Sequence, residues 1–240
     1  SSMTVPGYPY PPYPEPRRGR ADNPGGRYPF AEEVLTTGLR EATLTGNPYP
    51  VRGWMVYATN LLQSLPEQAE TIRAIQALDL LVVVDVIPSE IAGWADVVLP
   101  ESVYLERYDD LNVELFRDPF VALRQPVVDP PADQKPNWWI ARQLAVRLGL
   151  GAYYPWRTIE EYLDHRLRAA GHSLAELRRT GLVRGPGAPL YYEEGAPAEF
   201  PTPSGKIEFY SQQLRAAGHD PVPRYRPTPE PPPGSFRLLY

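Results

Sequence analysis

The sequence contains no cysteine, and this absence narrows the chemistry that its 240 residues support. Without a thiol these residues form no disulfide, bind no zinc through thiolates and ligate no iron–sulfur cluster of their own. Histidine is scarce as well, and His165, His172 and His219 follow no metal-ligand spacing. We therefore predict that all three histidines lie at the surface and that this chain supplies no metal ligand.

Three further absences exclude classes of partner. The net charge is −5 and no basic face stands out, so nucleic acid is not an expected partner. No apolar run approaches the roughly 18 residues of a membrane span, and the N-terminal residues lack the charged-then-apolar pattern of a signal peptide. The glycine fingerprints of NAD-type and P-loop sites, GxGxxG after a strand and GxxxxGK[ST], are also missing.

Proline is abundant, with 31 residues in the chain, and it is most concentrated at residues 6–16 and 221–233. Consecutive prolines forbid a helix and favour an extended chain. We predict a Pro/Tyr-rich extended arm over residues 1–30. The favoured interpretation is that this arm lies on the surface of a larger domain, and the less favoured one is that it binds in an aromatic-lined groove of a partner. Residues 220–240 form a second Pro-rich linker that leads into a strand. Since a domain seldom ends on its first strand, we expect a piece of a longer polypeptide.

The middle of the chain, residues 31–219, has the pattern of an α/β domain. An apolar strand at 54–59, a helix at 67–77 and a second strand at 80–84 form a βαβ unit with parallel strands. A short helical segment at 90–95 and a strand at 96–99 then repeat the helix–strand pattern in shorter form. The continuous apolar runs predict strands buried on both faces. The fold class is therefore α/β, a Rossmann-like parallel sheet flanked by helices, with Pro-rich extended arms at both ends.

The second half is predicted to be mainly helical. Apolar spacing predicts a helix over 137–148, and two capping boxes, TIEE and SLAE, open helices at 158 and 173. Further on, a turn and a short strand are expected at 202–209, followed by a last helix that ends at Gly218.

Polar side chains follow the first two predicted strands. Asn60 and Asp85 come just past parallel strands, and the carboxyl ends of such strands share one edge of the sheet. The two oxygens of Asp85 suit the adjacent N–H groups of a guanine or the hydroxyls of a ribose. Alternatively, Asp85 caps the following turn and Asn60 is a turn residue. The pattern alone leaves both interpretations open.

A charged cluster follows the third predicted strand and comprises Glu106, Arg107, Asp109 and Asp110. Paired carboxylates can perform acid–base catalysis. The preferred interpretations are that Arg107 holds an anion or that the cluster is a solvated turn.

Three runs of this sequence resemble signatures of one known family, and they occur in the same order as in that family. They are MVYATNLLQSLP at 55–66, VVVDVIPSEIAGWADVVLPESVYLER at 82–107 and FPTPSGKIEFYS at 200–211. Together they resemble the molybdopterin oxidoreductase family, which includes dimethyl sulfoxide reductase, and the resemblance covers residues 27–240. The run YLERYDDL at 104–111 is most similar to the polysulfide and thiosulfate reductase branch. The family's usual Glu-Lys-x-Gly and Gly-Arg are absent there, which weakens a nitrate or formate assignment.

This resemblance implies a cofactor. In the family, two molybdopterin guanine dinucleotides hold one molybdenum or tungsten, and two α/β domains each bind one of them. This chain resembles most of the second α/β domain, and residues 220–240 then lead into a truncated C-terminal β-barrel domain. Asn60, Val84, Asp85 and Arg107 match family contacts to the dinucleotide. Asn137 falls where some members place an aspartate.

The resemblance also implies the context of the chain. We expect part of a catalytic subunit that reduces polysulfide, thiosulfate or a related sulfur compound, with no catalytic residue in this segment and no turnover by it alone. A 4Fe-4S cluster is expected in the missing N-terminal part. The expected partners are the rest of the catalytic subunit, an iron–sulfur electron-transfer subunit and a membrane anchor subunit, on the periplasmic or extracytoplasmic side.

The alternatives are a stand-alone nucleotide-binding or cofactor-chaperone domain, an interaction protein that uses the Tyr/Pro arm, and arsenate, nitrate or formate chemistry.

Overall fold

The computed structural model describes residues 19–28, 30–31, 33–112, 119–185, 200–222 and 224–237. The chain divides into two compact units, residues 1–191 and 192–240. Most of the predicted arm at 1–30 lies outside the described residues, so its conformation stays a prediction. No helix in the described ranges has the length and apolar character needed to cross a membrane.

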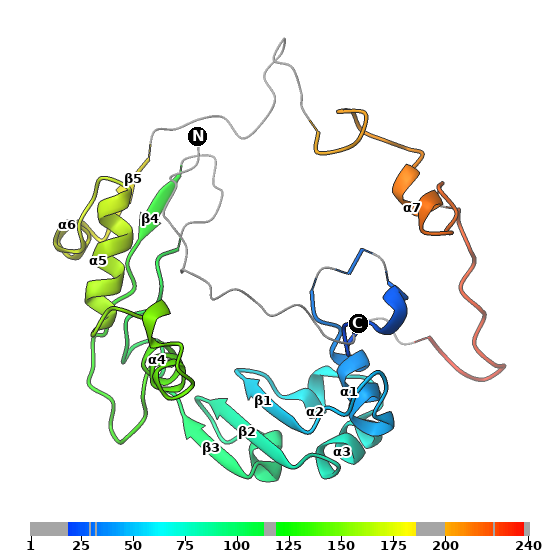
Figure 1. Ribbon diagram of the computed structural model, residues 1–240, viewed down its shortest axis with the longest axis horizontal. Coiled ribbons are helices and arrows are strands. Elements are labelled where there is room, and N and C mark those ends of the chain that lie inside the picture. Colours follow the sequence, from blue (N-terminus) through cyan, green and yellow to red (C-terminus); the bar gives the residue numbers. More distant parts are fainter. Residues whose placement is uncertain are drawn as a thin grey trace. The chain divides into compact units, whose positions relative to one another are not determined.

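The first unit contains a parallel sheet of β1 (Gly53–Tyr57), β2 (Leu80–Asp85) and β3 (Val97–Pro100), in the order β1-β2-β3 (Figure 1). The register places Tyr57 opposite Val84 and Asp85 opposite Pro100. The α/β fold class and the parallel arrangement predicted from the sequence are confirmed.

Helices cover one face of this sheet. They are α2 (Leu61–Ser64), α3 (Gln68–Gln76) and the short 3₁₀ helix η2 (Glu90–Trp94), while α1 (Thr36–Thr45) packs beside α3 and η1 (Pro24–Gly26) precedes it. The core between the sheet and these helices consists of six buried apolar side chains: Val56, Leu62, Ile75, Leu81, Val83 and Ile91. This core fixes the loops that follow β1 and β2.

The opposite face of the sheet is apolar but largely open. Val84 is buried there, whereas Met55, Tyr57 and Val97 are exposed by 52%, 45% and 42%. The prediction that all three strands are buried on both faces is therefore wrong for β1 and β3. A continuous apolar run shows that both faces are apolar, but it does not show what covers each of them.

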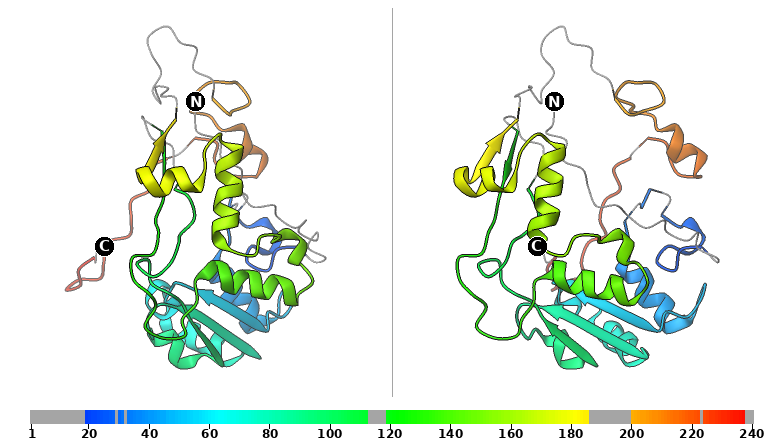
Figure 2. Two further views of the ribbon diagram at one scale, coloured as in Figure 1. Left: turned by 90° about the vertical axis from the view of Figure 1, so that its left-hand side faces the viewer. Right: turned by 60° about the vertical axis from the view of Figure 1, so that its left-hand side comes forward.

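A second core lies in the same unit. It is formed by α4 (Asn137–Arg147), α5 (Ile159–Ala169), α6 (Leu174–Thr180) and the antiparallel pair β4 (Phe120–Ala122) and β5 (Leu182–Arg184), with η3 (Gly151–Tyr153) after α4 (Figure 2). The N-cap half of both predicted capping boxes is present, because the Thr158 and Ser173 hydroxyls each accept a hydrogen bond from a backbone N–H three residues on, at 3.2 Å.

Helix α1 and the β4–β5 pair were not predicted. Strands of three residues are too short to show a period, and their partners are about sixty residues apart in the sequence.

The second unit contains α7 (Gln212–Ala216), whose N-cap Ser211 accepts a hydrogen bond from the Leu214 N–H at 3.2 Å. The turn predicted at the start of residues 202–209 is present. The short strand predicted after it is wrong, because residues 206–209 adopt no strand and Phe209 is 86% exposed. An extended segment needs a neighbouring strand for its backbone hydrogen bonds, which its sequence does not identify. Of the predicted terminal strand, residues 238–240 lie outside the described residues.

Candidate functional site

The carboxyl edge of the sheet, here called the rim, collects the predicted site residues. Asp85 ends β2, and its two oxygens accept hydrogen bonds from the Val86 N–H at 2.7 Å and the Ser89 hydroxyl at 2.9 Å. Asp85 therefore does cap its turn. An ionised carboxylate accepts about four hydrogen bonds, so Asp85, which is only partly buried, keeps acceptor capacity for a ligand.

Asn60 lies at the N-cap position of α2, but its side chain makes no capping hydrogen bond. Its Nδ2 instead donates to the carboxylate of Glu90, which joins the end of β1 to the turn that follows β2. Its Oδ1 is buried and has no hydrogen-bond partner in the described part of the chain. Buried acceptors are nearly always paired in folded proteins. Asn60 Oδ1 therefore fits a ligand that carries an N–H or O–H donor.

A second group of rim residues is built around Glu101, which follows β3 and is 3% exposed. We call Tyr57, Glu101, Arg107 and Asn137 the rim network. The Glu101 carboxylate accepts hydrogen bonds from the Tyr57 hydroxyl at 2.9 Å and from Arg107 Nη1. Glu101 thus links the end of β1 to the loop beyond β3.

Arg107 is held in place on several sides. Its Nη1 also donates to the Ser102 carbonyl at 2.6 Å, and its Nε donates to Asp109 at 2.7 Å. Among the described residues no hydrogen bond is found from its Nη2. Arg107 is therefore oriented by the protein and retains two N–H donors that fit an anionic oxygen.

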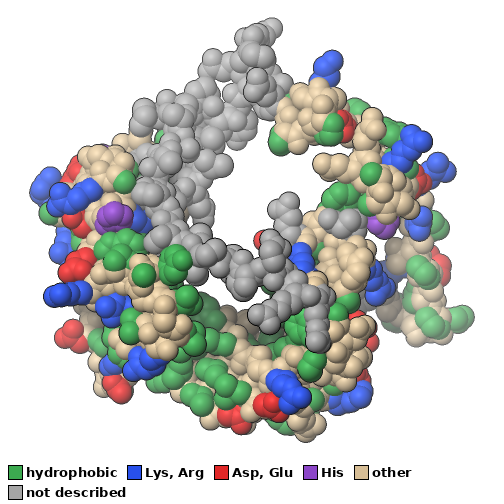
Figure 3. Space-filling view, in the orientation of Figure 1, with side chains coloured by type: hydrophobic (Ala, Val, Ile, Leu, Met, Phe, Trp, Pro, Cys, Tyr) green, Lys and Arg blue, Asp and Glu red, His purple; other side chains and the backbone are tan. Residues whose placement is uncertain are grey.

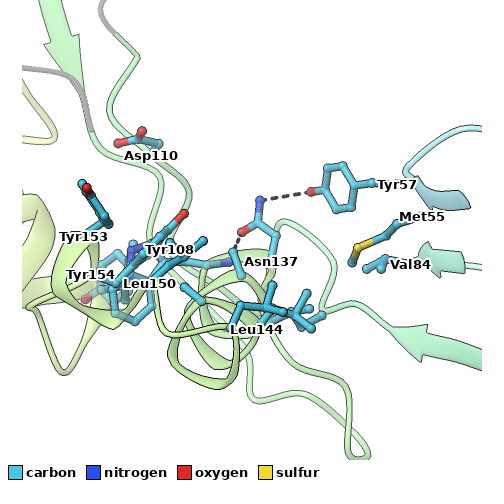
Figure 4. Close-up of a pocket in the computed structure, with 16 residues that line it drawn as sticks. Met55, Tyr57, Val84, Tyr108, Asp110, Asn137, Leu144, Leu150, Tyr153 and Tyr154 are labelled. Carbon is cyan, nitrogen blue, oxygen red and sulfur yellow. Dashed lines mark hydrogen bonds between the residues drawn. The ribbon is translucent and has the colours of Figure 1, made fainter. Parts of the chain in front are cut away.

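Asn137 reaches the rim through backbone pairing. The segment at Lys135 pairs with Glu101 beside β3, and α4 begins two residues later. Asn137 Nδ2 then donates to the Tyr57 hydroxyl at 3.0 Å, and the two side chains point toward each other in Figure 4. The start of α4 is thereby tied to the end of β1.

Two groups of the rim network have shifted pKa values. Although Tyr57 is 45% exposed, partial desolvation and the hydrogen bond to the buried Glu101 raise its pKa above the usual value, and the contact with Asn137 opposes this shift. Burial disfavours the charge of Arg107, but Asp109 and Glu101 outweigh that effect and raise the pKa of its guanidinium. The Tyr57 hydroxyl therefore stays protonated and Arg107 stays charged at neutral pH.

A pocket of about 580 Å³ lies beside the rim network, between the open face of the sheet and α4. Hydrophobic side chains gather over α4 and the sheet in Figure 3. Met55, Tyr57 and Val84 line it on the sheet side, and Asn137 and Leu144 line it on the α4 side (Figure 4). The pocket is mainly apolar, and Tyr57 and Asn137 are two of its polar side chains.

The remaining acidic residues of the predicted cluster are engaged in the fold. Asp109 also accepts from Arg124 at 2.6 Å, Asp110 pairs with Arg166, and Glu106 accepts from a backbone N–H. These contacts favour a structural role over acid–base catalysis. Within the described residues, no group of three histidine or acidic side chains could hold a metal ion.

The structure therefore places the predicted residues in two groups. Asn60 and Asp85 lie with the turn after β2, and Arg107 and Asn137 lie in the rim network, while Val84 lines the adjacent pocket. Their role in cofactor binding stays a prediction. Sequence reasoning missed Tyr57 and Glu101, although Glu101 follows β3 just as the other polar residues follow β1 and β2.

Comparison with known proteins identifies relatives across most of the chain. The family model described as molybdopterin oxidoreductase matches residues 22–147. The thiosulfate reductase molybdopterin-containing subunit PhsA of Salmonella typhimurium is 34% identical over 227 residues, which cover 84% of this chain and 30% of that protein. The acetylene hydratase of Syntrophotalea acetylenica is 32% identical over 189 residues, which cover 79% of this chain and 26% of that protein.

A solved structure shows the same arrangement. Acetylene hydratase from Pelobacter acetylenicus matches with a TM-score of 0.69 and 32% identity, over 79% of this chain and 26% of that chain. The chain thus spans less than a third of the length of these relatives. The family match over half of the chain, the sequence identity and the shared fold lead to one conclusion: this chain belongs to the molybdopterin oxidoreductase family.

Proposed function

We propose that this chain binds the guanine end of a molybdopterin guanine dinucleotide, as part of the catalytic subunit of a molybdenum or tungsten oxidoreductase. The observation that carries this proposal is the buried Oδ1 of Asn60, which has no hydrogen-bond partner among the described residues and is linked to Asp85 through the turn that holds Ser89 and Glu90. Acceptor oxygens at the carboxyl ends of two adjacent parallel strands match the N–H groups along one edge of guanine.

The rim network fits the rest of the dinucleotide. The Nη2 of Arg107, which makes no hydrogen bond within the described residues, suits a phosphate oxygen, because a guanidinium donates charge-assisted hydrogen bonds in a fixed plane. Asn137 opens α4, where backbone N–H groups favour an anion. When bound, the cofactor supplies a metal centre that exchanges two electrons with the substrate. The residues of this chain bind and orient it without taking part in bond-making.

For the substrate we propose thiosulfate, polysulfide or a related sulfur compound. The support is the similarity to PhsA over 84% of the chain, together with the run YLERYDDL. Family membership alone does not fix the reaction, since one relative is named as a hydratase and another as an assimilatory nitrate reductase. An iron–sulfur subunit, a membrane anchor, a 4Fe-4S cluster and an extracytoplasmic location belong to the same proposal.

The test uses the complete catalytic subunit, purified without oxygen. We expect molybdenum or tungsten by elemental analysis, and GMP after acid hydrolysis of the cofactor. Oxidation of a reduced viologen dye should then be fastest with thiosulfate or polysulfide. A loaded enzyme that prefers nitrate, arsenate or formate would refute the substrate, and a subunit that carries metal but no GMP would refute the guanine site.

A further inference from the structure

The rim network joins two predicted cofactor-binding residues that come from distant parts of the chain. Arg107 follows β3, and Asn137 opens α4. Both connect to the Glu101 carboxylate, Arg107 directly and Asn137 through the Tyr57 hydroxyl. Neither Tyr57 nor Glu101 is among the residues matched to a family contact with the dinucleotide.

We propose that Tyr57 and Glu101 are positioning residues, which set the direction in which Asn137 and Arg107 present their hydrogen-bond donors to the cofactor. This inference rests on the proposed function. It adds to it by assigning a role to two residues that need not touch the cofactor.

The argument follows from the direction of each hydrogen bond. An ionised carboxylate only accepts hydrogen bonds, so the Tyr57 hydroxyl must donate its single proton to Glu101. The Tyr57 oxygen is then left as an acceptor, and Asn137 must turn its NH₂ group toward it, at 3.0 Å. The carbonyl oxygen of the same amide accepts the Trp138 N–H at 2.7 Å. Glu101 thereby fixes which way the Asn137 amide faces.

The burial of Glu101 and Arg107 strengthens the hydrogen bonds by which Glu101 orients its partners. Glu101 is almost fully buried, and the side chain of Arg107 is 13% exposed. Hydrogen bonds in such surroundings are electrostatically stronger than in water, and an unpaired partner is costly. The raised pKa of Tyr57 keeps the hydroxyl protonated over the physiological range, so the direction of the chain of hydrogen bonds does not change with pH there.

The decisive variant is Tyr57→Phe, which removes the hydroxyl that connects Glu101 to Asn137 but leaves Glu101 paired with Arg107. In the complete catalytic subunit we expect the cofactor to dissociate roughly tenfold faster, since one hydrogen bond that orients a ligand-binding group is lost. The readouts are GMP retained per polypeptide over time and the urea midpoint of unfolding. Tyr108→Phe is the matched control, because its hydroxyl lies at the same pocket but contacts Arg178.

A double-variant cycle separates positioning from a structural role. If Tyr57 acts through Asn137, then Tyr57→Phe adds no further loss of GMP in an Asn137→Ala background. Glu101→Gln, whose amide both donates and accepts, should accelerate cofactor loss as well, because the direction at Tyr57 is no longer fixed.

Three outcomes contradict the inference. Unchanged GMP retention in Tyr57→Phe would overturn it while leaving the proposed function intact. Equal effects of Tyr57→Phe with and without Asn137→Ala, in step with the urea midpoint, would show a purely structural role. A wild-type subunit without GMP would overturn the proposed function itself, and this inference with it.

Discussion

Ile91 connects the core beneath the sheet to the predicted guanine site. It is one of the six side chains of that core and is fully buried, while the residues just before it, Ser89 and Glu90, bond to Asp85 and Asn60. We predict that Ile91→Ala destabilises the protein and also weakens retention of the cofactor, because the turn that carries these two contacts loses its anchor.

The size of the effect follows from the carbon atoms removed. Three buried carbon atoms at about 0.8 kcal/mol each give about 2.4 kcal/mol of lost transfer free energy. The cavity left behind adds to this, which places the total within the range of about 2–5 kcal/mol measured for such changes. With a denaturant slope of about 2–3 kcal/mol/M, the urea midpoint falls by about 1–2 M.

The assay is urea unfolding followed by tryptophan fluorescence. Ile87→Ala is the matched control, because it makes the same chemical change four residues away at a side chain that is 64% exposed. It should cost less than about 0.5 kcal/mol. Equal losses for the two variants would refute the reasoning that Ile91 anchors the turn.

Three further predictions concern the scaffold. Gly38→Ala places a Cβ 1.8 Å from the Asp22 carbonyl oxygen, and this clash should outweigh the gain of about 1 kcal/mol that alanine has over glycine in a helix, lowering the urea midpoint. Thr158→Ala removes the N-cap of α5 and should cost about 1 kcal/mol, measured in the same way. Burial raises the pKa of Asp164, but hydrogen bonds from the first N–H of α6 and from Arg168 outweigh it and lower that pKa overall. Its stabilisation is therefore present above the unfolded value of about 3.9 and lost as pH falls below it, so Asp164→Asn should flatten the acid limb of stability against pH.

Each of these has a contradicting result. Gly93→Ala adds a Cβ in open space, so a loss as large as that of Gly38→Ala would argue against the clash. An unchanged unfolding midpoint for Thr158→Ala would show that the cap contributes nothing, and an unchanged acid limb for Asp164→Asn would show that this carboxylate is not stabilised in the folded state.

The sequence predicts those parts of the fold that rest on local patterns. The apolar run of β2 and the capping boxes at Thr158 and Ser173 indicate their elements within one or two residues. The β4–β5 pair was missed because its stability comes from contacts distant in sequence. The strand expected near Phe209 is absent, because an apolar segment forms a strand only where a partner is available.

The candidate site also has features that the local sequence predicts and features that depend on the folded structure. The rule that ligands bind at the carboxyl ends of parallel strands predicts that Asn60 and Asp85 share one edge of the sheet, and the structure places them there, joined through the turn after β2. It did not show that Asn60 Oδ1 lacks a partner in the described part of the chain or that Asp85 also caps its turn, since these depend on the conformation of the turn after β2. The link from Glu101 to Asn137 depends on the pairing of Lys135 with Glu101 beside β3, and no local sequence pattern predicts that pairing.

The central claim is that the rim after β1 and β2 holds the guanine of the cofactor. The most direct measurement is GMP retained by the complete subunit carrying Asp85→Asn, compared with Asp79→Asn at the opposite end of β2, where the carboxylate is exposed and contacts Arg52. Loss of a hydrogen bond to a charged group, about 1.5–3 kcal/mol, predicts roughly 10- to 100-fold weaker retention for Asp85→Asn and no change for Asp79→Asn. Equal GMP retention in the wild type and both variants would contradict the account.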